Sequence, residues 1–265
     1  MRALVVSLAI ATTAIHAPSA LAEDAVPDSP AATPTRLARA RDASIDRGFL
    51  TAHAETIGEG KWAFNAYELI FIGLTYGFTD DIQASISTLL PIVEDIPLFI
   101  AIQPKFVLMR SPETIVSLRT PVTIGSSFDS DAEGTIVTFG AGVLVDQRLD
   151  AAGRFAMHAG LLASGAAGGG FDLTSDFEAA DGAFFELDLG VTLGVASILK
   201  LLFEVQALAV VSEDGFEFAD FVLFNYGVRF FSGSIAGDLG FIRPIGIDTD
   251  ELILGVPYLA FSARF

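Results

Sequence analysis

The sequence predicts an all-β fold, a transmembrane antiparallel up-and-down barrel of about 12 strands. Three observations predict it: apolar and polar side chains alternate over long stretches, long and short connections alternate along the chain, and 52% hydrophobic residues are combined with a formal net charge of −18. Alternation with a period of two residues is the pattern of a β-strand. High hydrophobicity together with strong acidity is typical neither of a disordered acidic chain nor of an ordinary soluble domain. The two properties are therefore expected to be segregated in the fold.

The N-terminal residues have the layout of an export signal. A positively charged start precedes an apolar run over residues 3–15, and a small-x-small motif predicts cleavage between Ala22 and Glu23. Residues 23–47 are rich in Pro, Ala, Asp and Arg, which predicts a disordered periplasmic tail. The barrel is expected over residues 48–265. Because the chain contains no cysteine, a disulfide framework and a cysteine-based metal site are excluded.

Strand patterns recur along the whole expected barrel. The stretch AFFELDLGVTLGV alternates most cleanly, with Phe, Leu and Val on one side and Glu, Asp, Gly and Thr on the other. The 12 expected strands, of which the first has the weakest pattern, are 48–57, 61–76, 81–90, 97–110, 113–128, 133–148, 152–164, 182–196, 198–212, 219–231, 234–243 and 251–265. Pro104 and Pro121 lie inside two of them, and since proline cannot donate a ladder hydrogen bond, we expect β-bulges there.

The connections give an independent test of this strand count. The expected outer set is GEGK, PIVEDIP, DSDAEG, GAAGGGFDLTSDFEAADG, SEDGFEFAD and RPIGIDTD, and the expected periplasmic set is GFTDD, SPE, LDAAG, AS and FSGS. All the long connections belong to the first set, an asymmetry typical of outer-membrane barrels. A soluble β-sandwich also alternates, but it leaves sheet edges that strands of this length must cover, whereas a barrel in lipid has none.

Two stretches carry a resemblance to a known family. The C-terminal LILGVPYLAFSARF resembles the last strand of bacterial outer-membrane β-barrel proteins. The stretch YELIFIGLTYGFTDDIQASISTLLP is similar to the second and third strands of an uncharacterised group of such barrels. The resemblance implies the outer membrane of a Gram-negative cell, contact with its lipid and lipopolysaccharide, and assembly by the barrel-insertion machinery. It also implies that Leu259, Phe261 and Phe265 form the assembly signal. The chain departs from the family's aromatic girdles in having 1 Trp and 4 Tyr, and we expect its 23 Phe to replace them.

Acidic residues are concentrated in the expected outer connections. Those segments, together with Glu251 directly after the last of them, hold 17 of the 33 acidic residues, but only two basic ones, Lys61 and Arg243. The acidic rim is either a solvated, self-repelling face or a surface that collects divalent cations. None of the connections has the spacing of a calcium loop, so no metal site and no cofactor are expected. Nucleic acid is excluded as a partner, because its phosphates would be repelled.

Charged residues on the polar strand faces are expected to point into the barrel, because a base facing lipid would cost about 2–4 kcal/mol at the bilayer midplane. Lys105 and Arg119 form a basic group, and Glu186, Asp188 and Glu204 an acidic one. The two groups either face each other across a pore constriction or interlock and close the lumen. Asp146 and Arg154 lie on either side of the LDAAG turn, which predicts a structural ion pair across that hairpin.

The function predicted from these features is a passive channel for small solutes with a lumen of mixed charge. The alternatives are a closed structural barrel without transport and a lipid-modifying barrel enzyme. An enzyme is the weaker alternative, because His53 and His158 are the only histidines after the expected signal and Ser164 lies too far along the strand from His158 to hydrogen-bond with it. We therefore predict no catalytic residues.

Overall fold

The computed structural model describes residues 42–68, 71–89, 98–127, 134–150, 154–169, 183–212, 215–246 and 254–265. The expected signal peptide, its cleavage site and the tail up to residue 41 lie outside these residues. The strands are β1 (Trp62–Tyr67), β2 (Phe71–Gly77), β3 (Ile82–Leu89), β4 (Leu98–Arg110), β5 (Thr114–Arg119), β6 (Val122–Ser127), β7 (Gly134–Arg148), β8 (Phe155–Gly169), β9 (Ala183–Ala196), β10 (Leu199–Ser212), β11 (Gly215–Ser232), β12 (Ile235–Ile245) and β13 (Val256–Arg264). Among the described residues, no helix is long and apolar enough to cross a membrane.

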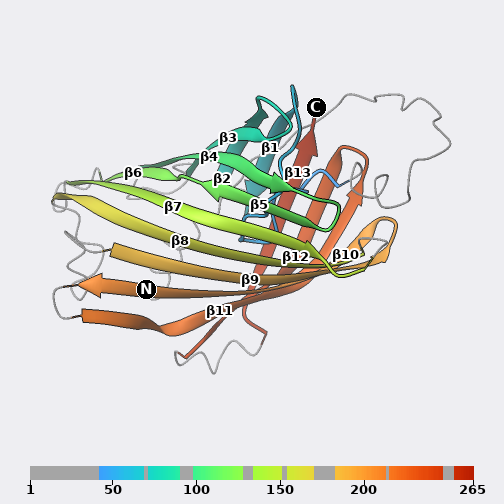
Figure 1. Ribbon diagram of the computed structural model, residues 1–265. Helices are drawn as coiled ribbons and strands as arrows, with labels where there is room; N and C mark the ends of the chain where they lie inside the picture. The colour runs from blue at the N-terminus through green and yellow to red at the C-terminus, as the bar shows by residue number, and fades with distance from the viewer. Residues whose placement is uncertain are drawn as a thin grey trace.

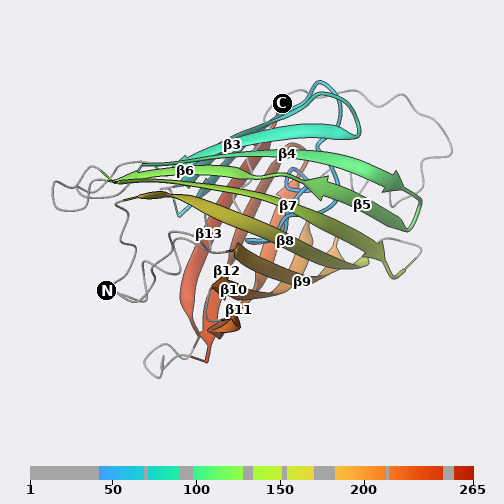
Figure 2. The ribbon, with the colours of Figure 1, turned by 60° about the vertical axis from the view of Figure 1, so that its left-hand side comes forward.

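The strands form one closed antiparallel barrel, as Figures 1 and 2 show from two directions. Closure is made by β1 and β13, whose register places Ala63 opposite Arg264 and Tyr67 opposite Ala260. β5 and β6 both lie between β4 and β7, so they are two halves of one interrupted strand and the barrel has 12 strands around its circumference. The predicted fold class is confirmed.

The two prolines lie at the same interruption of the sheet. Pro121 separates β5 from β6, and Pro104 lies on β4 beside the junction, where its carbonyl accepts a hydrogen bond from Thr120 N–H at 3.0 Å. The ladder between β3 and β4 continues through Pro104 without a shift, and the irregularity on the other side of β4 falls between Val107 and Met109. The bulge expected at Pro104 is therefore absent, whereas Pro121 does break its strand. The ladder of β4 resumes on both sides of the junction, with Lys105 opposite Arg119 and Ile102 opposite Val122.

The two faces of the barrel wall have opposite chemistry. On β9, Leu187 and Leu189 point outward with 44% and 47% of their surface exposed, while Glu186 and Asp188 point inward and are 6% and 2% exposed. The other strands repeat this pattern, with large apolar side chains outside and polar ones inside. A soluble protein buries its apolar face, so this inverted arrangement is suited to a wall surrounded by lipid.

The first expected strand, 48–57, is wrong. These residues form no strand apart from one isolated bridge between Arg47 and Ala52, and they lie inside the barrel, where Figures 1 and 2 show their light-blue trace within the ring of strands. The expected strand 61–76 instead divides into β1 and β2, which meet near Glu68, a residue with a φ of 48°. The sequence predicts a strand at 48–57 that is absent and a single strand at 61–76 where the structure has two. The two errors cancel, so the predicted total of 12 strands is unchanged.

The ends of the barrel differ in part from the expected assignment. GEGK is no outer hairpin, because residues 58–61 join the interior segment to β1 at the end where the tight turns 197–198 and 233–234 lie. The connection expected over residues 212–220 is shorter, since β10 runs to Ser212 and β11 begins at Gly215. Most of the acidic residues expected on the rim lie outside the described residues.

The outward face can be tested with one charge at two depths. Leu189→Arg places a base at the centre of β9, where lipid contact should lower the free energy of unfolding by about 2–4 kcal/mol. Ile198→Arg, in the turn between β9 and β10, should cost about 0–1 kcal/mol, because the residue is already at the barrel end. Urea titrations of folding into liposomes, followed by the fluorescence of Trp62, measure both values. Equal costs would contradict a lipid-facing wall.

Candidate functional site

The interior of the barrel is occupied by residues 42–57, here called the lumen segment. Every residue from Asp42 to Ile57 except Ile45 is buried. The segment is folded on itself, because Gly48 N–H donates to Thr51 O at 2.9 Å and His53 N–H donates to Asp46 O at 2.9 Å. Residues 42–47, expected to belong to a disordered tail, are thus part of the packed interior. Nothing in their composition distinguishes them from the residues before them.

The first half of the lumen segment is bound by Arg229 on β11. Its guanidinium donates to the carbonyl oxygens of Ser44 at 2.8 Å, Arg47 at 2.9 Å and Gly48 at 2.6 Å. Asp238 on β12 accepts hydrogen bonds from Arg229 at 2.7 and 2.9 Å and from Arg47 at 2.9 Å. Two arginines and one carboxylate are thus joined, with side-chain exposures of 1% or less. A buried arginine without such partners would be strongly destabilising.

Glu204 on β10 binds the turn at the middle of the lumen segment. Its carboxylate accepts the backbone N–H groups of Phe49 at 2.5 Å, Leu50 at 3.0 Å and Thr51 at 3.3 Å. A Cβ atom on Gly48 would lie 1.6 Å from Glu204 Oε1, so glycine is required for this approach. The sequence places Glu204 in an acidic group for a pore, but here it satisfies backbone donors that would otherwise be buried without partners.

Lys105 on β4 performs the complementary task for carbonyl groups. Its Nζ donates to His53 O at 2.8 Å, Glu55 O at 2.5 Å and Asp46 O at 3.4 Å. Lys105 is directly opposite Arg119 on β5, as the sequence predicts from the SPE turn. The two bases do not share a role, since Lys105 binds the lumen segment and Arg119 binds the wall.

Arg119 joins the basic and acidic groups of the wall. Its Nη2 donates to Glu186 Oε1 at 2.6 Å and to Asp188 Oδ2 at 3.2 Å, and all three side chains are buried. Gln206 extends the network by donating to Asp188 Oδ1 at 3.1 Å. Of the two arrangements left open by the sequence, the direct contact corresponds to interlocking side chains.

The expected ion pair between Asp146 and Arg154 is wrong. The register of β7 and β8 places Asp146 opposite His158, and Arg154 lies outside with 72% of its side chain exposed, 3.6 Å from Asp150. The pairing of β7 with β8 is centred on residue 152, since Arg148 lies opposite Ala156, and β8 begins only at Phe155. Arg154 therefore belongs to the turn and not to the ladder. Asp146 instead accepts Ala54 N–H at 3.0 Å and Glu55 N–H at 3.2 Å.

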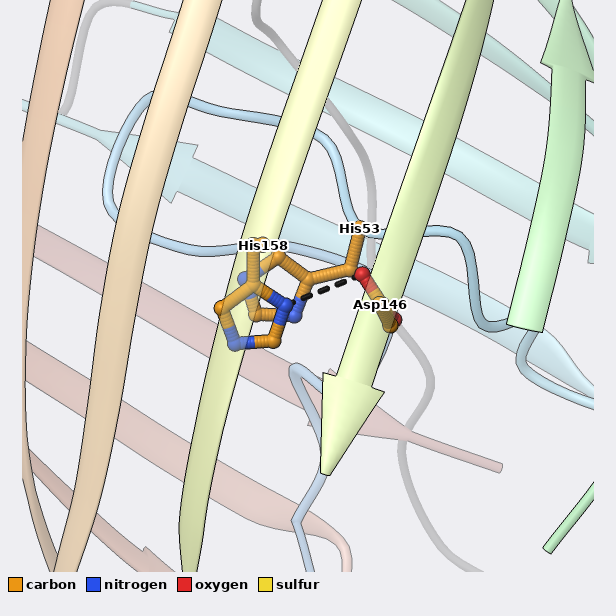
Figure 3. A group of neighbouring side chains, drawn as sticks. All are labelled: His53, Asp146 and His158. Carbon is orange, nitrogen blue, oxygen red and sulfur yellow. Dashed lines mark hydrogen bonds and ion pairs between the residues drawn. The ribbon is translucent and has the colours of Figure 1, made fainter. Parts of the chain in front are cut away.

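Asp146, His158 and His53 meet at the far end of the lumen segment (Figure 3). His158 Nδ1 lies 2.9 Å from Asp146 Oδ1, and the His53 ring stacks on the His158 ring at 3.6 Å between centroids. Burial, together with neighbouring His158, holds the pKa of His53 well below its ordinary value. These three residues are the contact that sequence reasoning missed, because His53 was placed in a strand.

His158 also meets a hydroxyl, since its Nε2 lies 3.0 Å from Thr192 Oγ1. The order of hydroxyl, imidazole and carboxylate is that of hydrolase triads. All three groups are buried, His53 covers the imidazole face, and Asp146 is engaged by the lumen segment. A substrate carbonyl therefore has no route to Thr192 in this arrangement, and the contacts give no support to a lipid-modifying enzyme.

An apolar contact completes the binding of the lumen segment. Phe49 and Leu50 belong to a buried cluster with wall residues such as Tyr258, whose ring meets Phe49 edge to face at 5.6 Å. The Phe49 ring lies over Gly227 and Gly240, where an added Cβ would come within 2.7 and 2.9 Å of its Cζ atom. These two glycines thus make room for the ring on β11 and β12.

The residues of the expected assembly signal lie on the outer face. Leu259 is 57%, Phe261 43% and Phe265 47% exposed, while Ser262 is fully buried. This agrees with the alternation read from the sequence. Recognition of these residues by the insertion machinery stays a prediction.

Comparisons with known proteins give only remote likenesses. No family model matches the chain, and no curated protein matches it. Among solved structures, the NanC porin is 7% identical over 77% of this chain and 97% of its own, with a TM-score of 0.46. OmpT of Vibrio cholerae is 10% identical over 74% and 64%, with a TM-score of 0.41, and LpxR from Salmonella typhimurium is 10% identical over 78% and 90%, with a TM-score of 0.39. The barrel assignment rests on the strand pairing itself.

Glu204 offers a test of the lumen segment. In Glu204→Gln the neutral amide has one acceptor oxygen for three N–H groups, and a charge-assisted hydrogen bond is worth about 1.5–3 kcal/mol. Transient release of the segment should then rise at least tenfold, because about 1.4 kcal/mol is a factor of ten. Trypsin cleavage after buried Arg47, followed by mass spectrometry, measures this release. Glu217→Gln, on the exposed part of β11, is the control and should cleave like the unmodified protein. Equal cleavage in both variants would show that Glu204 does not retain the segment.

Proposed function

We propose that the protein is an outer-membrane β-barrel whose passage for small solutes is closed at rest by its own lumen segment. The observation that carries the proposal is the binding of this segment's backbone by inward-facing charged side chains of the wall. Those side chains are Lys105, Asp146, Glu204 and Arg229. They come from four different strands, so the segment is bound around the interior and not along one side of it.

The outer-membrane location is supported by the inverted wall. Large apolar side chains cover the outside of strands that are up to 18 residues long, enough to cross a bilayer when tilted. Export by a signal cleaved between Ala22 and Glu23, contact with outer-membrane lipid and lipopolysaccharide, and assembly through Leu259, Phe261 and Phe265 belong to the same proposal. An acidic rim that attracts divalent cations is part of it as well.

A passage is favoured by the polarity of the interior. A barrel built only to be closed can fill its lumen with apolar side chains, which need no hydrogen-bond partners. Here the wall instead presents charged groups, which water can solvate when the lumen segment leaves. Lys105 would then be free beside Arg119, while Glu186 and Asp188 already neutralise the latter. The mixed-charge lumen expected from the sequence would thus be exposed only in the open form.

A closed structural barrel is the second candidate. It is favoured by Phe49 and Leu50, whose burial against Tyr258 and neighbouring apolar residues would be lost if the segment left. Fully burying one such side chain is worth about 1.5–3 kcal/mol. The two candidates differ in whether a released lumen segment leaves a conducting barrel.

Planar-bilayer recordings with a locked and a loosened segment separate these candidates. The chain has no cysteine, and Ser44 Oγ lies 2.7 Å from Ser262 Oγ on β13, so Ser44→Cys/Ser262→Cys should form a disulfide that retains the segment. The loosened variant Phe49→Ala/Glu204→Gln should show discrete conductance steps at voltages where the unmodified protein is silent. Adding the cysteine pair to that variant should abolish the steps, and a reducing agent should restore them.

Two results would overturn the proposal. Steady conductance through the oxidised, locked variant would mean that the passage does not depend on the segment. Silence of the loosened variant, after trypsin cleavage has demonstrated release, would mean that the barrel is closed without the segment and would favour the structural role. Glu217→Gln is the matched control for charge removal on an exposed site.

A further inference from the structure

Three side chains from separate parts of the chain form a compact group in the lumen. Among the described residues, His53 of the lumen segment, Asp146 of β7 and His158 of β8 place possible ligand atoms within 4.8 Å of one another (Figure 3). Two imidazole nitrogens and one carboxylate oxygen suit Zn²⁺ and similar transition-metal ions, whereas Ca²⁺ and Mg²⁺ prefer oxygen ligands alone. The group is independent of the acidic rim.

The surroundings of His158 and Asp146 match those of metal ligands. The carboxylate of Asp146 can only accept, so His158 Nδ1 carries the proton in the 2.9 Å contact. When an ion binds, the other tautomer is needed: Nε2–H donates to Thr192 Oγ1, 3.0 Å away, and the lone pair of Nδ1 faces the ion. Asp146 is oriented by the N–H groups of Ala54 and Glu55. Outer hydrogen bonds of this kind fix the tautomer of a ligating histidine and the direction of a ligating carboxylate.

His53 supplies the second, independent observation. Its backbone is fixed, because its N–H donates to Asp46 O at 2.9 Å and its carbonyl accepts from Lys105 Nζ at 2.8 Å. Its side chain is buried, with 6% of the residue exposed, yet within the described part of the chain its ring nitrogens have no hydrogen-bond partner. An imidazole nitrogen without a hydrogen-bond partner, beside a carboxylate and a second imidazole, is available for coordination.

We propose that His53, His158 and Asp146 bind one transition-metal ion, Zn²⁺ being the reference case, with water completing a tetrahedral shell. Ligand atoms about 2.0–2.1 Å from such an ion lie roughly 3.3 Å apart, so atoms now within 4.8 Å need only a small approach. The rings are parallel within 3°, and in-plane lone pairs of parallel rings cannot converge on one point. Coordination therefore turns His53 out of the stack while Thr192 keeps His158 in place.

The ion would join the lumen segment to the wall. Of the three ligands, one belongs to the segment and two to adjacent strands. A bound ion therefore stabilises the closed form, by a free energy that rises with the logarithm of its concentration above the dissociation constant. This consequence rests on the proposed function. Metal binding itself does not, and it is measured without a bilayer.

Cobalt binding provides the test, because Co²⁺ has visible absorption bands that report its ligands. The full chain, purified in detergent without a histidine tag and stripped with a chelator, should bind one Co²⁺ with tetrahedral bands, and Zn²⁺ should displace it. His53→Gln and Asp146→Asn should each weaken binding at least tenfold. The control is Thr51→Ala, in the same lumen segment as His53. It removes a buried hydroxyl that has no hydrogen-bond partner among the described residues, and it should bind like the unmodified protein. Heat-modifiable gel migration verifies that each variant is folded.

A gain of signal guards against variants that merely unfold. Because the chain has no cysteine, His53→Cys should retain Co²⁺ and add a thiolate-to-metal absorption band. The proposal is overturned if the unmodified protein and His53→Gln bind Co²⁺ equally, which would assign the binding to the acidic residues of the surface. It is also overturned if folded His53→Cys shows no thiolate band.

Discussion

Charged side chains inside a closed barrel must find partners there, and most of this structure depends on that constraint. Strand alternation with an apolar outer face sends Lys105, Glu204 and Arg229 inward, where they are 3% exposed or less. An uncompensated buried charge is strongly destabilising. The lumen segment removes this cost because an irregular backbone carries unpaired N–H and C=O groups in equal number. Carboxylates take its donors and the bases take its acceptors, so segment and wall satisfy each other.

This mutual satisfaction explains why the segment has no regular secondary structure. A helix would pair its backbone groups internally and a strand would pair them with a neighbouring strand, so in both cases the wall charges would lose their partners. Glycine at position 48 permits the approach of Glu204, and Gly227 and Gly240 admit the Phe49 ring. The interior is therefore a polar interface with an apolar anchor at Phe49 and Leu50 and smaller apolar contacts at Ala43, Ala52 and Ala54. Specificity for this particular segment lies in the positions of those glycines and charges.

The barrel could be predicted from the sequence to a large extent, and the site only in part. Strand period and connection length depend on local pattern, so β9 and β10 were found within one residue of their observed limits, whereas β13 begins five residues later than expected. The inward direction of Glu186 and Asp188 followed from the same alternation. Their contact with Arg119 joins β5 to β9, and the sequence left it open as one of two arrangements. Residues 48–57 were misread because a segment buried in a polar lumen and a weak strand have similar compositions. Pairing between the segment and the wall spans up to 218 residues, which no local pattern encodes.

The same contacts bear on how the lumen could open. When water replaces the segment, the free-energy cost of losing the charged contacts is partly offset, because the solvated ions regain hydration. The burial of Phe49 and Leu50 is lost outright. Opening is thus opposed by the apolar anchor as well as by the charged groups, which also fix where the segment returns. A device that regulates closure would act at the end of the segment away from this anchor, where Lys105 and Asp146 bind the backbone beside the smaller apolar contacts of Ala52 and Ala54. His53 lies there, between the backbone bound by Lys105 and the carboxylate of Asp146, with its imidazole packed against His158.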